Sequence, residues 1–157
     1  LRTSEEDGGS GAASVKDLRR SFWNGFYEYV TDLQDFSDVF GDFSARKENA
    51  DSWCSIGIGK AKVHLDAYVA FDSGWHRVGV DAYFTDVDYY GTYFDRRKEI
   101  DDMLVDLEVE WDDLDCNKKT RKVHADIFPD TVDSDTWPAA YEWLVAALWK
   151  FKAAFGG

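Results

Sequence analysis

The sequence predicts an α+β domain: a mainly antiparallel five-stranded sheet with three helices on one face, in the order α-β-β-β-α-β-β-α. Three observations indicate this fold. Between Trp53 and Phe84, apolar and polar residues alternate in successive short runs, the pattern of strands that bury one face. Before and after this stretch, apolar residues recur at steps of three and four, the pattern of amphipathic helices. The short connections between strands predict hairpins, whose strands pair antiparallel.

The composition indicates a single folded domain. The chain has 157 residues, and 45% of them are hydrophobic, which is enough to build a core and excludes a disordered chain. No apolar run approaches the roughly 18 residues that a membrane helix needs, so we expect no membrane partner. Cys54 and Cys116 belong to no CxxC pair, which argues against a zinc site and predicts free thiols in the reducing cytoplasm.

The first residues differ from the rest in composition. Residues 1–13 are polar and rich in glycine and serine, as in a flexible linker or tail. Residues 14–157 then form the single α+β domain. Because the chain begins with Leu1 and opens with a linker-like segment, we expect it to be the C-terminal part of a longer protein. An ordinary disordered terminus or an expression remnant would look the same.

The first helix is expected to begin at Ser14, a suitable N-cap residue, and to end near Leu33. Residues 36–50 lose this periodicity and predict a loop, with three phenylalanines of the loop tucked under the core. The apolar stripe of the helix consists of Val15, Leu18, Phe22, Phe26, Val30 and Leu33.

The first three strands are expected at Trp53–Ile58, Lys62–Phe71 and Trp75–Phe84, with a hairpin turn at residues 72–74. Because side chains alternate between the two faces of a strand, the second and third strands divide cleanly into inward and outward sets. The inward residues are Val63, Leu65, Ala67, Val69, Phe71, Val78, Val80, Ala82 and Phe84.

The second half of the chain is expected to contain two further helices and two further strands. Thr85 or Asp86 caps a helix that runs to about Leu104, and alternation then predicts strands at residues 107–111 and 122–127, joined by a polar turn. The last helix, from Trp137 to Phe155, has the clearest stripe and carries a proline in its first turn, where a missing N–H is harmless.

The charge disfavours a nucleic-acid partner without excluding one. Acidic residues outnumber basic ones by 31 to 18, which gives a net charge of −13 and repels a phosphate backbone. A smaller group of basic residues lies at 96–98. The candidate phosphate contacts form the largest basic cluster: Lys118, Lys119, Arg121 and Lys122. A solvated turn is the simpler explanation of this cluster.

Histidines and carboxylates alternate on the outward positions of two strands. His64-x-Asp66 and His124-x-Asp126 each place both side chains on one face. If their strands are neighbours, the four groups could bind a divalent metal. The alternative, which the sequence favours, is a solvated outer face of the sheet on which His and Asp are merely tolerated. We expect no metal, no cofactor and no catalytic residue. The candidate outer-face site comprises His64, Asp66, Arg77, Asp81, His124 and Asp126.

Other familiar sites are missing from the sequence. A magnesium-dependent nuclease centre needs an E-x-K pair, and Glu108-x-Glu110 lacks the lysine. Gly57-x-Gly59 is followed at once by another strand and not by a helix, so it does not form a phosphate-binding loop.

Several motifs in order resemble a known bacterial and archaeal family. They are Trp23 with Phe26, the WCSIGIG and RVGVDAYF strands, YFDRRKEID followed by VEWDDL, and the WPAAYEWLVAALWKFKAAF helix. The family is a domain of unknown function of about 140 residues, often found C-terminal to a PD-(D/E)XK nuclease domain, and the resemblance covers about residues 17–155. It implies an accessory module and carries over no catalytic residue. Residues 60–62 and the acidic charge depart from the family pattern.

These observations favour a non-catalytic accessory or interaction domain of an uncharacterised bacterial protein, which the resemblance attaches to a nuclease. Its partner would be an N-terminal domain in the same chain or another protein. Two alternatives belong to other classes: a nucleic-acid-binding accessory of a nuclease, and a metal-dependent enzyme that uses the His/Asp face of the sheet.

Overall fold

The computed structural model describes residues 11–41, 48–72 and 75–156. Its five strands form one sheet in the order β2-β3-β4-β6-β5, and every neighbouring pair is antiparallel. This confirms the predicted α+β class and the five-stranded antiparallel sheet. The strands are β2 (Trp53–Gly57), β3 (Val63–Asp72), β4 (Trp75–Phe84), β5 (Glu110–Trp111) and β6 (Arg121–Ile127).

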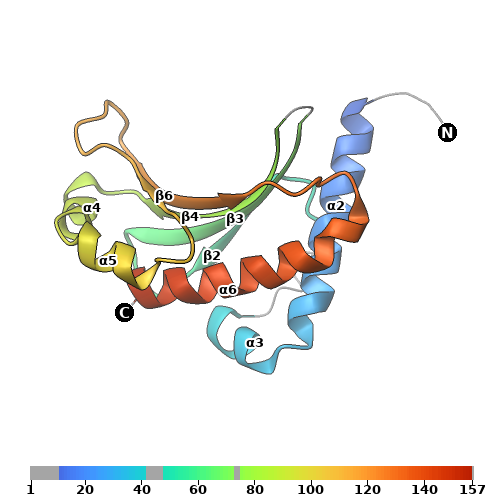
Figure 1. The fold of residues 1–157 in the computed structure, drawn as a ribbon, viewed down its shortest axis with the longest axis horizontal. Helices are drawn as coiled ribbons and strands as arrows, with labels where there is room; N and C mark the ends of the chain where they lie inside the picture. The colour runs from blue at the N-terminus through green and yellow to red at the C-terminus, as the bar shows by residue number, and fades with distance from the viewer. Residues whose placement is uncertain (1–10, 42–47, 73–74, 157) are drawn as a thin grey trace.

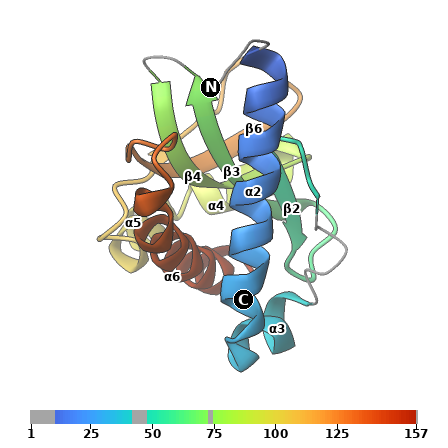
Figure 2. The ribbon, with the colours of Figure 1, turned by 90° about the vertical axis from the view of Figure 1, so that its right-hand side faces the viewer.

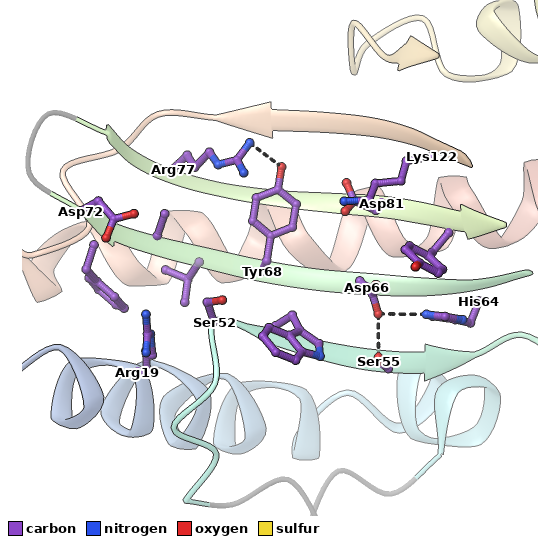
Figure 3. Close-up of a pocket in the computed structure, with 15 residues that line it drawn as sticks. Arg19, Ser52, Ser55, His64, Asp66, Tyr68, Asp72, Arg77, Asp81 and Lys122 are labelled. Carbon is purple, nitrogen blue, oxygen red and sulfur yellow. Dashed lines mark hydrogen bonds and ion pairs between the residues drawn. The ribbon is translucent and has the colours of Figure 1, made fainter. Parts of the chain in front are cut away.

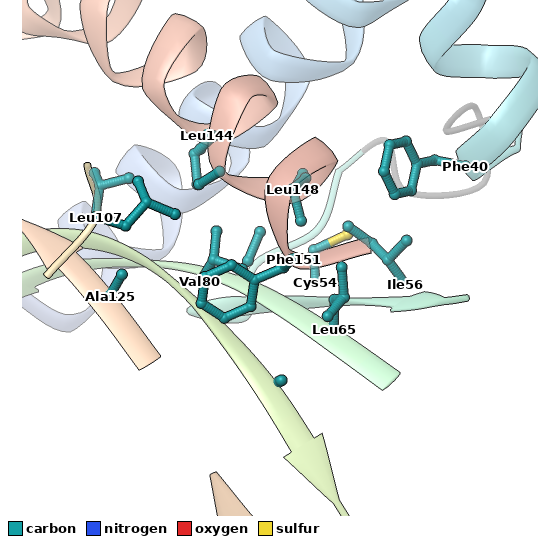
Figure 4. Packing of buried hydrophobic residues seen from close by; sticks show 14 of the residues in the cluster. Phe40, Cys54, Ile56, Leu65, Val80, Leu107, Ala125, Leu144, Leu148 and Phe151 are labelled. Carbon is teal, nitrogen blue, oxygen red and sulfur yellow. The ribbon is translucent and has the colours of Figure 1, made fainter. Parts of the chain in front are cut away.

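The core lies between the sheet and α6 (Trp137–Phe155), which runs beneath it (Figure 1). In Figure 4, Leu144, Leu148 and Phe151 point from this helix toward the inner side chains of the strands. All three are fully buried, as are the inward residues Leu65 and Val80. The alternation along β3 and β4 therefore predicted the buried face correctly.

The first helix of the described residues, α2 (Gly11–Thr31), packs across α6 (Figure 2). The Tyr141 hydroxyl of α6 donates a hydrogen bond to the Phe22 carbonyl at 2.7 Å. A Cβ atom at Gly25 would lie 2.3 Å from that same hydroxyl, so the missing side chain lets the two helices approach. The helix begins at Gly11, three residues before its expected start, and residues 1–10 of the expected linker lie outside the described residues.

The structure has more helices than the sequence predicts. The expected loop at 36–50 contains α3 (Gln34–Phe40), which buries Phe36 and Phe40 as expected; Phe43 lies outside the described residues. The expected helix at 86–104 is divided into α4 (Val87–Phe94) and α5 (Arg97–Met103), followed later by a short 3-10 turn before α6.

The N-cap of α4 is Asp86, whose carboxylate accepts a hydrogen bond from the Tyr89 N–H at 2.8 Å. The turn after α4 lets both short helices bury a residue in the core, Tyr90 from α4 and Ile100 from α5. None of the helices in the described part of the chain is long and apolar enough to cross a membrane.

The fourth expected strand is much shorter than predicted. Only Glu110 and Trp111 pair with β6, although alternation extends back to Leu107. Glu108 has a φ of 51°, in the left-handed region that residues other than glycine rarely adopt. The extended conformation that alternation predicts is therefore interrupted at Glu108, two residues before β5 begins.

Candidate functional site

The outer face of the sheet is concave, and none of the described helices covers it (Figure 1). The β3–β4 end and the connection from β5 to β6 rise on either side of it, and a hollow of about 550 Å³ lies against β2, β3 and β4. Figure 3 shows the side chains around this hollow. We call the following residues the concave face: Ser55, His64, Asp66, Tyr68, Arg77, Asp81, Tyr83, Lys122, His124 and Asp126.

The strand register sets these residues in rows across the sheet. Asp66 pairs with Asp81, and Asp81 pairs with His124. One step along the strands, Tyr68 pairs with Gly79, and Gly79 pairs with Asp126. In each row, therefore, β3 and β6 lie on either side of β4.

The Tyr68 side chain spans β4. Its hydroxyl donates a hydrogen bond to the Asp126 carboxylate across Gly79, where an added Cβ would lie 2.3 Å from the tyrosine ring. Arg77 lies over the same ring at 4.5 Å and donates to the Tyr68 oxygen at 3.2 Å and to Asp126 at 3.1 Å. Burial and the bond to Asp126 raise the pKa of the Tyr68 hydroxyl above its ordinary value. Tyr68, Arg77 and Asp126 therefore form one polar network above Gly79.

A second group joins β2 to β3. The Ser55 hydroxyl donates to Asp66 at 2.7 Å, and the His64 imidazole approaches the same carboxylate oxygen at 3.3 Å (Figure 3). The aspartate lies between the serine and the histidine. A Ser-His-Asp hydrolase needs the histidine in the middle, where it can take the serine proton. This group therefore does not activate Ser55 as a nucleophile.

Asp81 occupies the centre of the concave face and is only 8% exposed. Burial raises the pKa of its carboxyl from the ordinary 3.8 to about 6, and the charges of Asp66 and Asp126 act in the same direction. Lys122 and His124 oppose this rise. Asp81 consequently changes charge close to neutral pH, a property common at binding and catalytic sites.

The condition for a shared metal site is not met. His64 and Asp66 lie on β3, whereas His124 and Asp126 lie on β6, and β4 separates the two strands. The His124 imidazole instead faces Glu110 at 3.3 Å. Within residues 11–41, 48–72 and 75–156, no three His, Cys, Asp or Glu side chains are grouped so that they could hold a metal ion.

The structure divides the predicted basic cluster. Arg121 is 3% exposed, because it lies two residues from Val123 on β6 and points to the same inner side of the sheet. Its guanidinium donates hydrogen bonds to the carbonyls of four residues in the preceding turn. It is thus placed to hold the turn together and cannot reach a phosphate. Lys118 and Lys119 are exposed, and Lys122 lies on the concave face, 5.9 Å from the Tyr83 ring.

Several residues that line the hollow do not appear among the sequence-predicted site residues, including Tyr68 and Tyr83 of the concave face. Ser55 and Trp53 lie on the outward positions of β2, and Trp53 is 52% exposed at the rim. Arg19 reaches the hollow from α2. The alternation of β2 could have indicated Ser55 and Trp53, since they flank the buried Cys54, but no local pattern relates a residue of α2 to the outer face.

Comparisons with curated proteins and with solved structures found no match. A family model does match, over residues 18–157, which is almost the whole chain. This agrees with the family resemblance of the strand and helix motifs. The chain belongs to the family described as "Domain of unknown function (DUF4268)".

Proposed function

We propose that this domain is a non-catalytic interaction module whose concave face binds a basic segment of a partner protein. One observation carries the proposal: the charged groups of this face are held in place by one another within a hollow of about 550 Å³. Binding to groups that are already ordered costs less conformational entropy than binding to mobile ones.

The charge of the face favours a basic partner. The carboxylates Asp66, Asp81 and Asp126 outnumber the basic residues Arg77 and Lys122 on this face, and Arg77 is paired with Asp126 at 3.1 Å. The whole chain carries a net charge of −13. Such a field attracts cationic partners over long distances and repels polyanions. Trp53 at the rim supplies an exposed aromatic side chain of the kind that often anchors interfaces.

The alternatives receive less support. A nucleic-acid site would need clustered basic side chains, and Arg121 is occupied by backbone carbonyls. A metal-dependent enzyme would need the two His/Asp pairs in one site, and β4 separates the strands that carry them. The order Ser55–Asp66–His64 does not activate the serine as a nucleophile either. The family resemblance adds a source for the basic segment: an N-terminal PD-(D/E)XK nuclease domain in the same chain of a bacterial protein.

Titration of the ¹⁵N-labelled domain with an Arg-Gly-Arg-Gly-Arg-Gly peptide tests this function. We expect amide shifts concentrated on β2, β3 and β4, and no such shifts with a matched Glu-Gly peptide. Trp53→Ala should weaken binding by about tenfold, as expected for an aromatic anchor. Val105→Ala is the matched control, because Val105 is 70% exposed away from the hollow. Equal binding of both peptides, or shifts spread over the whole surface, would refute the proposal.

A further inference from the structure

A second surface lies at the β6 edge of the sheet. β6 extends from Arg121 to Ile127, but β5 pairs only with Val123 and His124. In the described part of the chain, no strand pairs with β6 beyond His124 on this side. Glu108, with its left-handed φ of 51°, lies two residues before β5, and Leu107 and Glu108 line a hollow beside this edge without pairing with β6.

The backbone groups of this gap point outward. The Asp112 N–H donates to the Lys122 carbonyl at 3.0 Å, so the Lys122 backbone faces β5. In an antiparallel strand, alternate residues direct their N–H and C=O groups to the same side. The N–H and C=O of Asp126 therefore face the open edge, where an added strand could bond to them.

A hollow of about 690 Å³ lies along this edge, a size common for binding clefts. Its apolar lining includes Leu107, Ile127 and Trp143, and Phe128 is 67% exposed beside them. Its charged lining is mainly acidic, because Asp106, Glu108, Glu110 and Asp126 outnumber Arg77, which is paired with Asp126. An exposed edge with an apolar wall is a site that proteins normally cover.

We propose that this edge binds an extended segment of a partner protein by strand addition, and that the segment alternates apolar and basic residues. Pairing with the backbone of Asp126 would set its register. Its apolar side chains would contact Leu107, Ile127 and Trp143, and its basic side chains would face the acidic lining. Arg77 borders both hollows, but Trp53 lines only the first and Phe128 only the second. The proposal does not depend on the proposed function of the concave face.

Backbone pairing distinguishes strand addition from simple charge attraction. We would measure the affinity of an acetylated, amidated Lys-Val-Lys-Val-Lys-Val peptide by fluorescence anisotropy. The control is the same peptide with N-methyl groups at alternate residues, which keeps its charge and removes half of its donors. We expect the N-methylated peptide to bind at least tenfold more weakly. Equal affinity of the two peptides would overturn the proposal.

Two surface variants locate the site. Phe128→Ala should weaken the Lys-Val peptide at least threefold, and Val132→Ala, which changes an exposed residue outside the hollow, should leave its affinity unchanged. Trp53→Ala should not affect this peptide, and Phe128→Ala should not affect the Arg-Gly peptide. Light scattering adds a further test: a dimer of the wild type that Phe128→Ala abolishes would mean that a second copy covers the edge, which would overturn the choice of occupant.

Discussion

The two faces of β3 and β4 are built from alternate residues of the same strands, yet they are organised by different forces. On the inner face, Leu65 and Val80 are fully buried against α6, and such packing is non-directional. On the outer face, Asp66 and Tyr68 are only partly buried, and each makes bonds to particular partners on other strands. The inner face can accept side-chain changes of similar volume, whereas the outer face depends on the identity and register of its residues.

The largest effect is expected on the inner face. Phe151→Ala removes a fully buried ring and leaves a cavity, which should lower the free energy of unfolding by about 3–5 kcal/mol. Urea denaturation measures this change. Phe128→Ala makes the same substitution at a site that is 67% exposed, and it should change stability by only about 0.5 kcal/mol. Similar losses in the two variants would contradict the division into a packed core and an open edge.

A pH-dependent effect is expected from the outer face. The pKa of Asp81 is raised from 3.8 to about 6, so the folded state binds this proton more tightly than the unfolded state. Below about pH 3.8 both states are protonated and Asp81 imposes no penalty. Between about pH 3.8 and pH 6, the Asp81 carboxyl ionises first in the unfolded state. The free energy of unfolding therefore falls across this range by up to roughly 3 kcal/mol.

The Asp81→Asn variant lacks this titration. The wild type should therefore lose stability relative to this variant as the pH rises from about 3.8 to 6. Urea unfolding at several pH values measures the difference in the free energy of unfolding. Asp72→Asn changes the same charge at an exposed position of β3 and should show no comparable trend. A difference for Asp81→Asn that is flat with pH would show that the carboxyl is better solvated than its position indicates.

The smallest effect concerns the contact over β4. Gly79→Ala would place a Cβ 2.3 Å from the Tyr68 ring and 2.4 Å from an Asp126 oxygen, which should cost about 1–3 kcal/mol. Gly57→Ala is the matched control, because no atom lies within 4 Å of its added Cβ. Adding Tyr68→Ala to Gly79→Ala should recover part of the loss. No recovery would indicate that the strain lies in the backbone of β4 and not in the side-chain contact.

The sequence predicted the features that depend on local periodicity. Alternation separated Val63 and Leu65 from His64 and Asp66 correctly, because the side-chain period of a strand is a local property. The break between α4 and α5 and the left-handed turn at Glu108 were missed, since apolar spacing continues through both. These two features depend on how the elements pack against the sheet.

The site was predictable only in part, because its contacts depend on strand order. His64, Asp66, Arg77, Asp81, His124 and Asp126 do share one face, but nothing in the spacing showed that β4 would separate the two His/Asp pairs. Two signals were available. Arg121 has the inward parity of Val123, which indicates burial. Gly79 lies between Arg77 and Asp81 at an outward position, and a glycine inside a strand often marks the close approach of another group.

The bond between Tyr141 and Phe22 has a consequence for protein synthesis. It joins the last helix to the first across 119 positions of the chain. On the ribosome, α2 emerges long before α6, so the contacts of Phe22 with Trp137 and Tyr141 can form only after almost the whole domain has been translated. Contacts that span so much of a chain slow folding, and the nascent α2 presents an apolar stripe of the kind that chaperones bind.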